Sequence, residues 1–206
     1  MRHFVITLVV IALLSPQSAT AQEGQALVVA TRSADLLCRD AMNKAVLRIR
    51  EKVMSRADAV DIFAAFFQVK TRREALTQSL DKYLATGGDS FSILEVNLTV
   101  VDAARRLSDS LTALVPTANS HRLLDQEAMH AMAAYLRNSN GEVVHQFESE
   151  RDLWLTVTVG EAVRLLGQLN DDNEAFLAAY KTLGAAILTN YGADAIKEAA
   201  RKPTTQ

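Results

Sequence analysis

The sequence predicts an all-α protein, a bundle of about six long amphipathic helices. Between Pro16 and Pro116 the chain contains no proline, and none follows until Pro203. Because proline breaks helix interiors, these proline-free stretches favour long helices. Alanine, leucine, arginine and glutamate, which are good helix formers, recur throughout. Apolar residues also recur at steps of three and four, the spacing that places them on one helical face.

The first 21 residues have the pattern of a secretory signal peptide. Arg2 supplies a positive charge, Phe4–Leu14 is an almost uninterrupted apolar run, and Ala21 ends a small-residue site of the kind that a signal peptidase reads. We therefore expect cleavage between Ala21 and Gln22. The apolar run is too short to span a bilayer, which needs roughly 20 residues. We expect a periplasmic or secreted protein with no stable membrane span after cleavage.

The rest of the chain suits a single helical domain over residues 22–202, followed by a frayed tail at 203–206. Without the leader its net charge is about −3, with no long run of one sign, so nothing favours nucleic acid or an anionic membrane as a partner. Cys38 is the only cysteine, which excludes an intramolecular disulfide. Two interpretations of Cys38 stay open: a buried inert thiol, or a bridge between two copies of a homo-oligomer.

The first predicted helix covers about Gln25–Met54 and carries one continuous apolar face. The second, about Ala57–Ala85, has a heptad-like apolar seam that only Arg73 interrupts. Phe63 and Phe67 widen its apolar face. The seam consists of Ile62, Phe66, Val69, Leu76, Leu80 and Tyr83. Thr86 and the two glycines after it are expected to end this helix.

Ser92 and Glu95 have the spacing of a capping box, and they predict a third helix that ends at Pro116. A polar link, Thr117–Ser120, is expected to lead into a fourth helix over Leu123–Arg137. The turn residues 138–141, Asn-Ser-Asn-Gly, close that helix.

A fifth helix is predicted from Glu142 to Leu169. Asp171 and Glu174 are then expected to cap a sixth helix that runs to Tyr191. A short last helix, Ala193–Lys202, follows Gly192.

One alternative to an all-helical chain is a small two-stranded element near residues 91–101 and 153–159. Both segments contain β-branched residues, and in the second of them apolar and other residues alternate with period two. We favour helix, because both segments continue without a turn into helical sequence and an isolated two-stranded ribbon is marginally stable.

Two Glu-x-x-His spacings, Glu127–His130 and Glu142–His145, are the only candidates for a metal site. A turn near residue 139 would leave the two pairs on the order of 10 Å apart along the helix axis, too far to share a metal pair. In a helix His121 and Asp125 would also face one another, but they are too few to bind a metal. We therefore expect no metal and no cofactor, and the catalytic residues, if there are any, stay unknown.

Candidates for partner contact are the seam-breaking Arg73 and the aromatic residues Phe63, Phe67 and Trp154. Arg73 either pairs with an acidic residue or a partner, or lays its stem along the seam with its head in water. The aromatic residues suit a core equally well.

These observations lead to three hypotheses for the function. The first is an exported helical protein that binds another envelope or secreted protein, as an accessory, adaptor, chaperone or inhibitor. The second is an enzyme or metal-binding bundle with its ligands dispersed over several helices. The third is an apolar-ligand-binding bundle whose pocket is lined by Phe63, Phe66, Phe67 and Trp154.

Overall fold

The computed structural model describes residues 34–85, 90–129 and 159–202. This part of the chain is 88% helical, with six helices and no strand. The helices are residues 34–50, α2 (Arg56–Ala85), α3 (Ser90–Asn119), α5 (Val159–Asp171), α6 (Asn173–Tyr191) and α7 (Ala193–Arg201). The prediction of an all-α bundle is confirmed.

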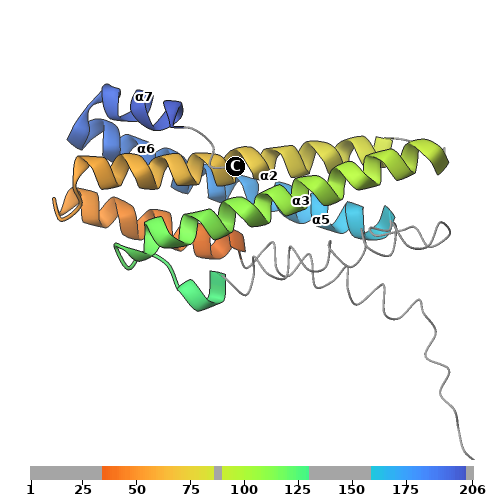
Figure 1. Ribbon diagram of the computed structural model, residues 1–206, viewed down its shortest axis with the longest axis horizontal. Helices are drawn as coiled ribbons and strands as arrows, with labels where there is room; N and C mark the ends of the chain where they lie inside the picture. The colour runs from red at the N-terminus through yellow and green to blue at the C-terminus, as the bar shows by residue number, and fades with distance from the viewer. Residues whose placement is uncertain (1–33, 86–89, 130–158, 203–206) are drawn as a thin grey trace, which may run out of the picture.

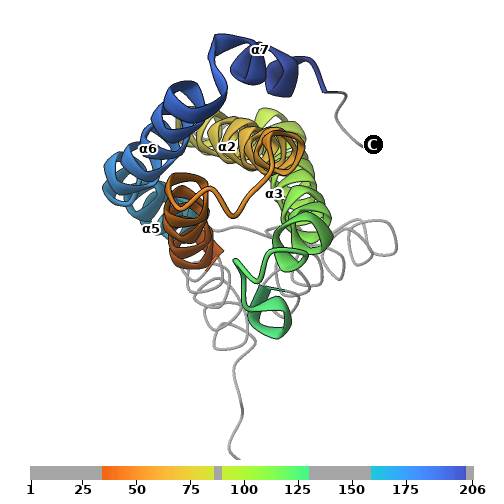
Figure 2. The same cartoon turned by 90° about the vertical axis from the view of Figure 1, so that its left-hand side faces the viewer.

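The two longest helices, α2 and α3, lie side by side and run in opposite directions (Figure 1). Viewed end-on, helix 34–50, α2, α3 and the α5–α6 pair surround one interior, and α7 lies outside against α2 and α6 (Figure 2). Helix α2 therefore has neighbours on several sides, which explains why its apolar face is so wide.

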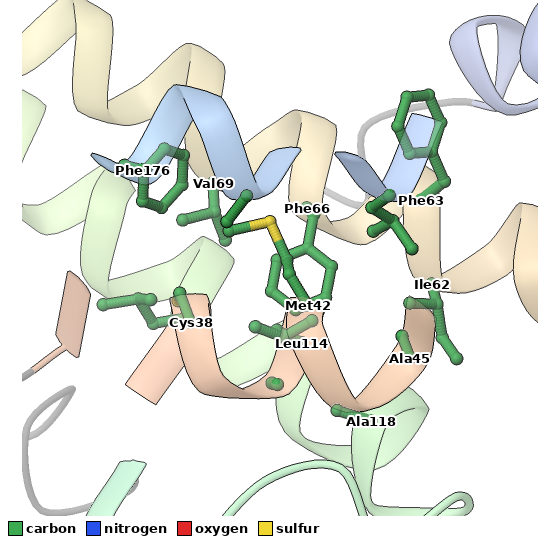
Figure 3. Close-up of a cluster of buried hydrophobic side chains, with 14 of the residues drawn as sticks. Cys38, Met42, Ala45, Ile62, Phe63, Phe66, Val69, Leu114, Ala118 and Phe176 are labelled. Carbon is green, nitrogen blue, oxygen red and sulfur yellow. The ribbon is translucent and has the colours of Figure 1, made fainter. Parts of the chain in front are cut away.

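Side chains from helix 34–50, α2, α3 and α6 fill the interior, as the close-up in Figure 3 shows. Cys38, Met42 and Ala45 come from helix 34–50 and face residues of α2, α3 and α6. The α2 side chains labelled there are Ile62, Phe63, Phe66 and Val69, those of α3 are Leu114 and Ala118, and that of α6 is Phe176. Close packing of this kind is the main source of stability in a bundle without disulfides.

The first helix ends at residue 50, earlier than the predicted Met54. The Val53 amide donates to Arg48 O (3.0 Å) and the Lys52 amide to Ile49 O (3.1 Å). This pair of bonds is a Schellman motif, and it places Lys52 in the left-handed region with φ 58°. The beginning of the predicted helix, residues 25–33, lies outside the described residues.

Helix α2 begins one residue before its predicted start and ends at the predicted Ala85. Ser55 caps it: its hydroxyl accepts from the Asp58 amide (3.1 Å) and donates to Asp58 Oδ2 (2.6 Å). This reciprocal bonding is a capping box with aspartate in place of glutamate. The predicted turn at Thr86–Gly88 lies outside the described residues.

Helix α3 is longer than predicted at both ends. Ser92 lies inside it, so the predicted capping box with Glu95 does not mark its start. Pro116 lies inside it too, because a proline in the last turn removes only one helical hydrogen bond. The helix ends in a second Schellman motif, in which Leu123 N donates to Ala118 O (3.1 Å) and Arg122 has φ 52°.

Residues 91–101 belong to α3, which excludes a strand there, as we favoured. Residues 153–158, the other half of the alternative ribbon, lie outside the described residues.

The next helical turn begins at residue 126 and not at Leu123. Asp125 caps it, accepting from the Ala128 amide (3.0 Å), while Leu123 and Leu124 are buried in the core. The rest of the predicted fourth helix, the turn at 138–141 and most of the predicted fifth helix lie outside the described residues.

Helices α5 and α6 are separated by Asp172 alone. Asp172 holds the N-cap position of α6 with helical backbone angles and makes no side-chain cap, so the predicted cap by Asp171 and Glu174 is wrong. Gly192, with φ 82°, separates α6 from α7, which ends at Arg201, one residue before the predicted end.

Candidate functional site at one end of the bundle

Arg73 lies in the interior, with only 2% of its surface exposed. Its Nε donates to Asp35 Oδ2 (2.9 Å), which joins α2 to helix 34–50. Its Nη2 donates to the carbonyl oxygen of Leu169 (2.6 Å) and its Nη1 to Asn173 Oδ1 (2.9 Å). The guanidinium therefore bridges the break between α5 and α6.

This geometry decides between the interpretations of Arg73. It pairs with an acidic residue of its own chain, and the alternative of a head group in water is wrong. The face of its guanidinium lies over the Phe176 ring, 5.2 Å from the ring centre. Arg73 is thus a clasp between helices, and it does not lie on a surface that another protein could contact.

Further charged side chains lie beside this clasp. Burial raises the pKa of the Asp35 carboxyl, although the Arg73 guanidinium acts in the opposite direction. Arg39 and Asp172 lie 3.7 Å apart beside it. Burial also raises the pKa of the Cys38 thiol, with a smaller contribution from Asp35. The thiol is fully buried, which agrees with the first interpretation of Cys38, an inert packed side chain.

Two of the aromatic candidates that the structure describes, Phe63 and Phe66, belong to the core. Phe63 is buried and stacks on Tyr180, with ring centroids 4.8 Å apart and planes at 17°. Phe66 is fully buried and Phe67 is partly buried. Trp154 lies outside the described residues, so the predicted pocket of four aromatic residues stays a prediction.

The metal candidates are not brought together within the described part of the chain. Glu127 is exposed, while His130, Glu142 and His145 lie outside the described residues. Over residues 34–85, 90–129 and 159–202, no three histidine, cysteine, aspartate or glutamate side chains gather as a metal site would require. Asp125 caps a helix, and His121 lies beside Asp58 of α2.

A second polar cluster lies at the end of the bundle where helix 34–50 turns into α2. We call this region the turn end; it comprises residues 51–61, residues 116–121, the end of α6, and α7. Tyr191 of α6 donates its hydroxyl to Met54 O. Arg56 Nη2 lies 2.8 Å from Glu198 Oε2 of α7, and Lys202 pairs with Asp61. Segments far apart in the sequence therefore meet around the first turns of α2.

Asp58 contacts both the cap of α2 and the segment that follows α3. Its Oδ1 lies 3.5 Å from His121 Nε2, and its Oδ2 accepts from Ser55. The hydrogen bond from Ser55 is the largest influence on the carboxyl, and with His121 it holds the pKa of Asp58 below its usual value. Burial, and then the charge of Asp58, raise the pKa of Tyr191.

Two open clefts flank the first turns of α2. One, of about 310 Å³, lies toward the end of α3, and the other, of about 590 Å³, lies toward α7. The first is lined by Asp58, Asp61, Pro116, Thr117, Ser120 and His121, and the second by Arg56, Asp194, Lys197, Glu198, Arg201 and Lys202. Charged side chains of both signs thus surround α2 at the turn end.

Two large apolar side chains are exposed at the same end. Val53 is 60% exposed and precedes Met54, and Leu188 is 52% exposed and lies one turn before Tyr191. The Tyr191–Met54 hydrogen bond therefore brings their two chain segments together. Sequence reasoning missed this site, because its members come from separate segments and carry no common spacing. Only the capping distance between Ser55 and Asp58 was visible in the sequence.

Comparisons with protein-family models, with curated proteins and with solved structures find no match to this chain. Within the parts of the chain that the structure describes, no helix has the length and apolar character needed to cross a membrane.

Proposed function

We propose that this chain is an exported helical protein that acts by binding another envelope or secreted protein through the turn end. The supporting observation is the exposure of Val53 and Leu188 beside two charged clefts. Protein interfaces commonly combine a small apolar centre with a polar, solvent-accessible rim. The turn end offers exposed apolar side chains and charged clefts.

The charges of this region suit the selection of a partner. The cleft beside α7 carries four basic side chains and two acidic ones, whereas Asp58 and Asp61 line the cleft beside α3. Charges at the rim of an interface mainly affect the rate of association and the choice of partner. A partner with an apolar contact flanked by an acidic and a basic group fits this arrangement.

The test is capture of a partner from the native envelope by Val53→Glu and Leu188→Glu, alone and together, against the unchanged chain. A buried glutamate without a partner group costs free energy, so each variant should retain less of the bound protein. Val163→Glu is the matched control, because Val163 is 54% exposed but lies in α5, away from the turn end. Equal retention by the double variant and the control contradicts the proposal.

The export half of the proposal has its own measurement. Mass spectrometry of the exported protein should find Gln22 at the N-terminus, because the Ala-Thr-Ala sequence before it suits a signal peptidase. Recovery of intact residues 1–21 in a membrane fraction contradicts it.

A further inference from the structure

We propose that the outer face of helix 34–50 pairs with the same face of a second copy of this chain, with the two helices antiparallel. The outer face consists of the exposed residues Leu36, Asp40, Asn43, Lys44 and Leu47. Figure 2 shows this helix at the edge of the bundle, beside α5 and α6. The inference concerns a surface other than the turn end and does not depend on the proposed function.

The apolar part of the outer face is a pair of leucines on one line. Leu36 is 46% exposed and Leu47 is 56% exposed. At about 100° per residue their directions differ by roughly 20°, and they lie about 16 Å apart along the axis. Suppose that a second copy of this helix runs antiparallel and that the two-fold axis passes level with the midpoint of residues 41 and 42. Leu36 of each copy then lies opposite Leu47 of the other.

The charges between the leucines are complementary in the same arrangement. Asp40 and Lys44 form an ion pair on the outer face, with Nζ 2.6 Å from Oδ2. The antiparallel register that pairs the leucines brings Asp40 level with Lys44 of the second copy, to within about 1.5 Å along the axis. Both residues lie on the same side of the leucine line, so two aspartates and two lysines alternate across the contact.

The parallel orientation lacks this complementarity. In a parallel two-fold pair the Asp40–Lys44 side of one helix faces the Asn43 side of the other, so neither charge meets an opposite charge of the second copy. The charge pattern therefore selects a two-fold antiparallel dimer, the commonest symmetry of homo-oligomers. Asn43, on the other side of the leucine line, then lies near Asn43 of the second copy, where each amide can donate to the other.

An interface one helix wide is smaller than the roughly 800 Å² per partner of a standard stable complex. We therefore expect a dimer that dissociates on dilution. Sedimentation of the purified full chain over a wide range of concentrations should show a monomer–dimer equilibrium. A chain that stays monomeric at the highest soluble concentration overturns the proposal.

A charge-swap experiment tests the orientation directly. Asp40→Lys gives a face with two lysines and Lys44→Asp gives a face with two aspartates, so each variant alone should sediment as a monomer. An equimolar mixture of the two variants should restore the dimer, because each basic face then meets an acidic one. The control is Asp102→Lys, which disrupts a similar exposed ion pair with Arg106 on α3 and should leave dimerisation unchanged.

Two further results bear on the apolar contact. Leu36→Glu together with Leu47→Glu should raise the dissociation constant at least tenfold while the helical circular dichroism signal is retained. Leu188→Glu, at a matched exposure of 52%, should leave it unchanged. A mixture of charge variants that stays monomeric, or a dimer that survives the two leucine changes, refutes the antiparallel interface.

Discussion

Arg73 shows how a single buried charge joins distant parts of this bundle. A desolvated guanidinium is costly unless its N–H groups find acceptors. Here Asp35, Leu169 O and Asn173 supply them from three different helices. Removing the side chain therefore deprives each of those groups of its partner.

We expect Arg73→Leu to destabilise the chain by about 3–5 kcal/mol, the usual cost of breaking a buried ion pair. Leucine would complete the apolar seam of α2, but Asp35 would then be left buried without its cation. Asp35→Leu should cost a similar amount. The double variant should lose less than the sum of the two, since neither charge remains.

Urea unfolding of the four proteins measures these differences. Arg106→Leu is the control: Arg106 is an exposed arginine with an aspartate partner, and its removal should change the free energy of unfolding by less than about 1 kcal/mol. An Arg73→Leu chain as stable as the unchanged one would mean that the clasp adds nothing to stability.

The sequence identified Arg73 but not its environment. Its place in an apolar seam made it conspicuous. Asp35, its partner, lies 38 residues away, and the acceptor Leu169 O lies 96 residues away. No spacing rule connects positions so far apart, because they meet only through the tertiary packing of the helices.

At the scale of the helices, stretches with strong apolar periodicity were predicted well and helix ends were not. The seam of α2, with Thr86 and the two glycines after it, predicted the limits of this helix to within one residue. Helix 34–50 and α3 end at Schellman motifs with Lys52 and Arg122 in the left-handed conformation. Such ends are recognised in sequences by glycine, so two basic residues in that position concealed them.

The left-handed backbone conformation of Lys52 and Arg122 therefore costs conformational free energy at both helix ends, and a glycine would not incur this cost. We expect Lys52→Gly and Arg122→Gly each to stabilise the chain by about 0.5–1 kcal/mol, because glycine adopts positive φ without the cost of a side chain. Thermal unfolding monitored by circular dichroism checks this.

The matched control for these changes is Gln78→Gly, at an exposed position inside α2, which should cost about 1 kcal/mol. Destabilisation by all three glycines would mean that the left-handed residues carry no strain, or that their side chains make compensating contacts.

Over the whole molecule, the two polar clusters differ in kind. The Arg73 clasp is buried, whereas the turn end is open to solvent, and about 25 Å of α2 separates Arg73 from Arg56. The all-helical architecture followed from periodicity and proline spacing, but the turn end did not. It exists only once α6, α7 and the end of α3 lie against the beginning of α2.

Acid should loosen the turn end. The pKa of Asp58 is lower in the folded chain than its ordinary value of 3.8, so the carboxylate stabilises the fold at higher pH. That contribution is complete above the ordinary value and is lost as the pH falls through the folded pKa. Amide hydrogen exchange around residues 53–61 should therefore accelerate as the pH falls below about 4, after correction for intrinsic rates.

Ser55→Ala is the informative comparison, because the Ser55 hydroxyl is the main cause of the low pKa. In this variant the acid-induced loss of protection should be smaller and should be complete at a higher pH, and the lost cap should cost about 1 kcal/mol at neutral pH. If amide exchange around residues 53–61 depends on pH in the same way in Ser55→Ala and in the unchanged chain, a carboxyl other than Asp58 causes the loss of protection.

The separation of the Arg73 acceptors along the chain also has a consequence for folding kinetics. Contacts with Leu169 and Asn173 close loops of 96 and 100 residues, and contacts between such distant segments form late. Loss of an interaction that is absent from the transition state accelerates unfolding and leaves the folding rate nearly unchanged. Stopped-flow measurements on Arg73→Leu should therefore show a faster unfolding limb beside an unaltered folding limb. The clasp determines how long the folded chain survives, while local helix formation determines how quickly it appears.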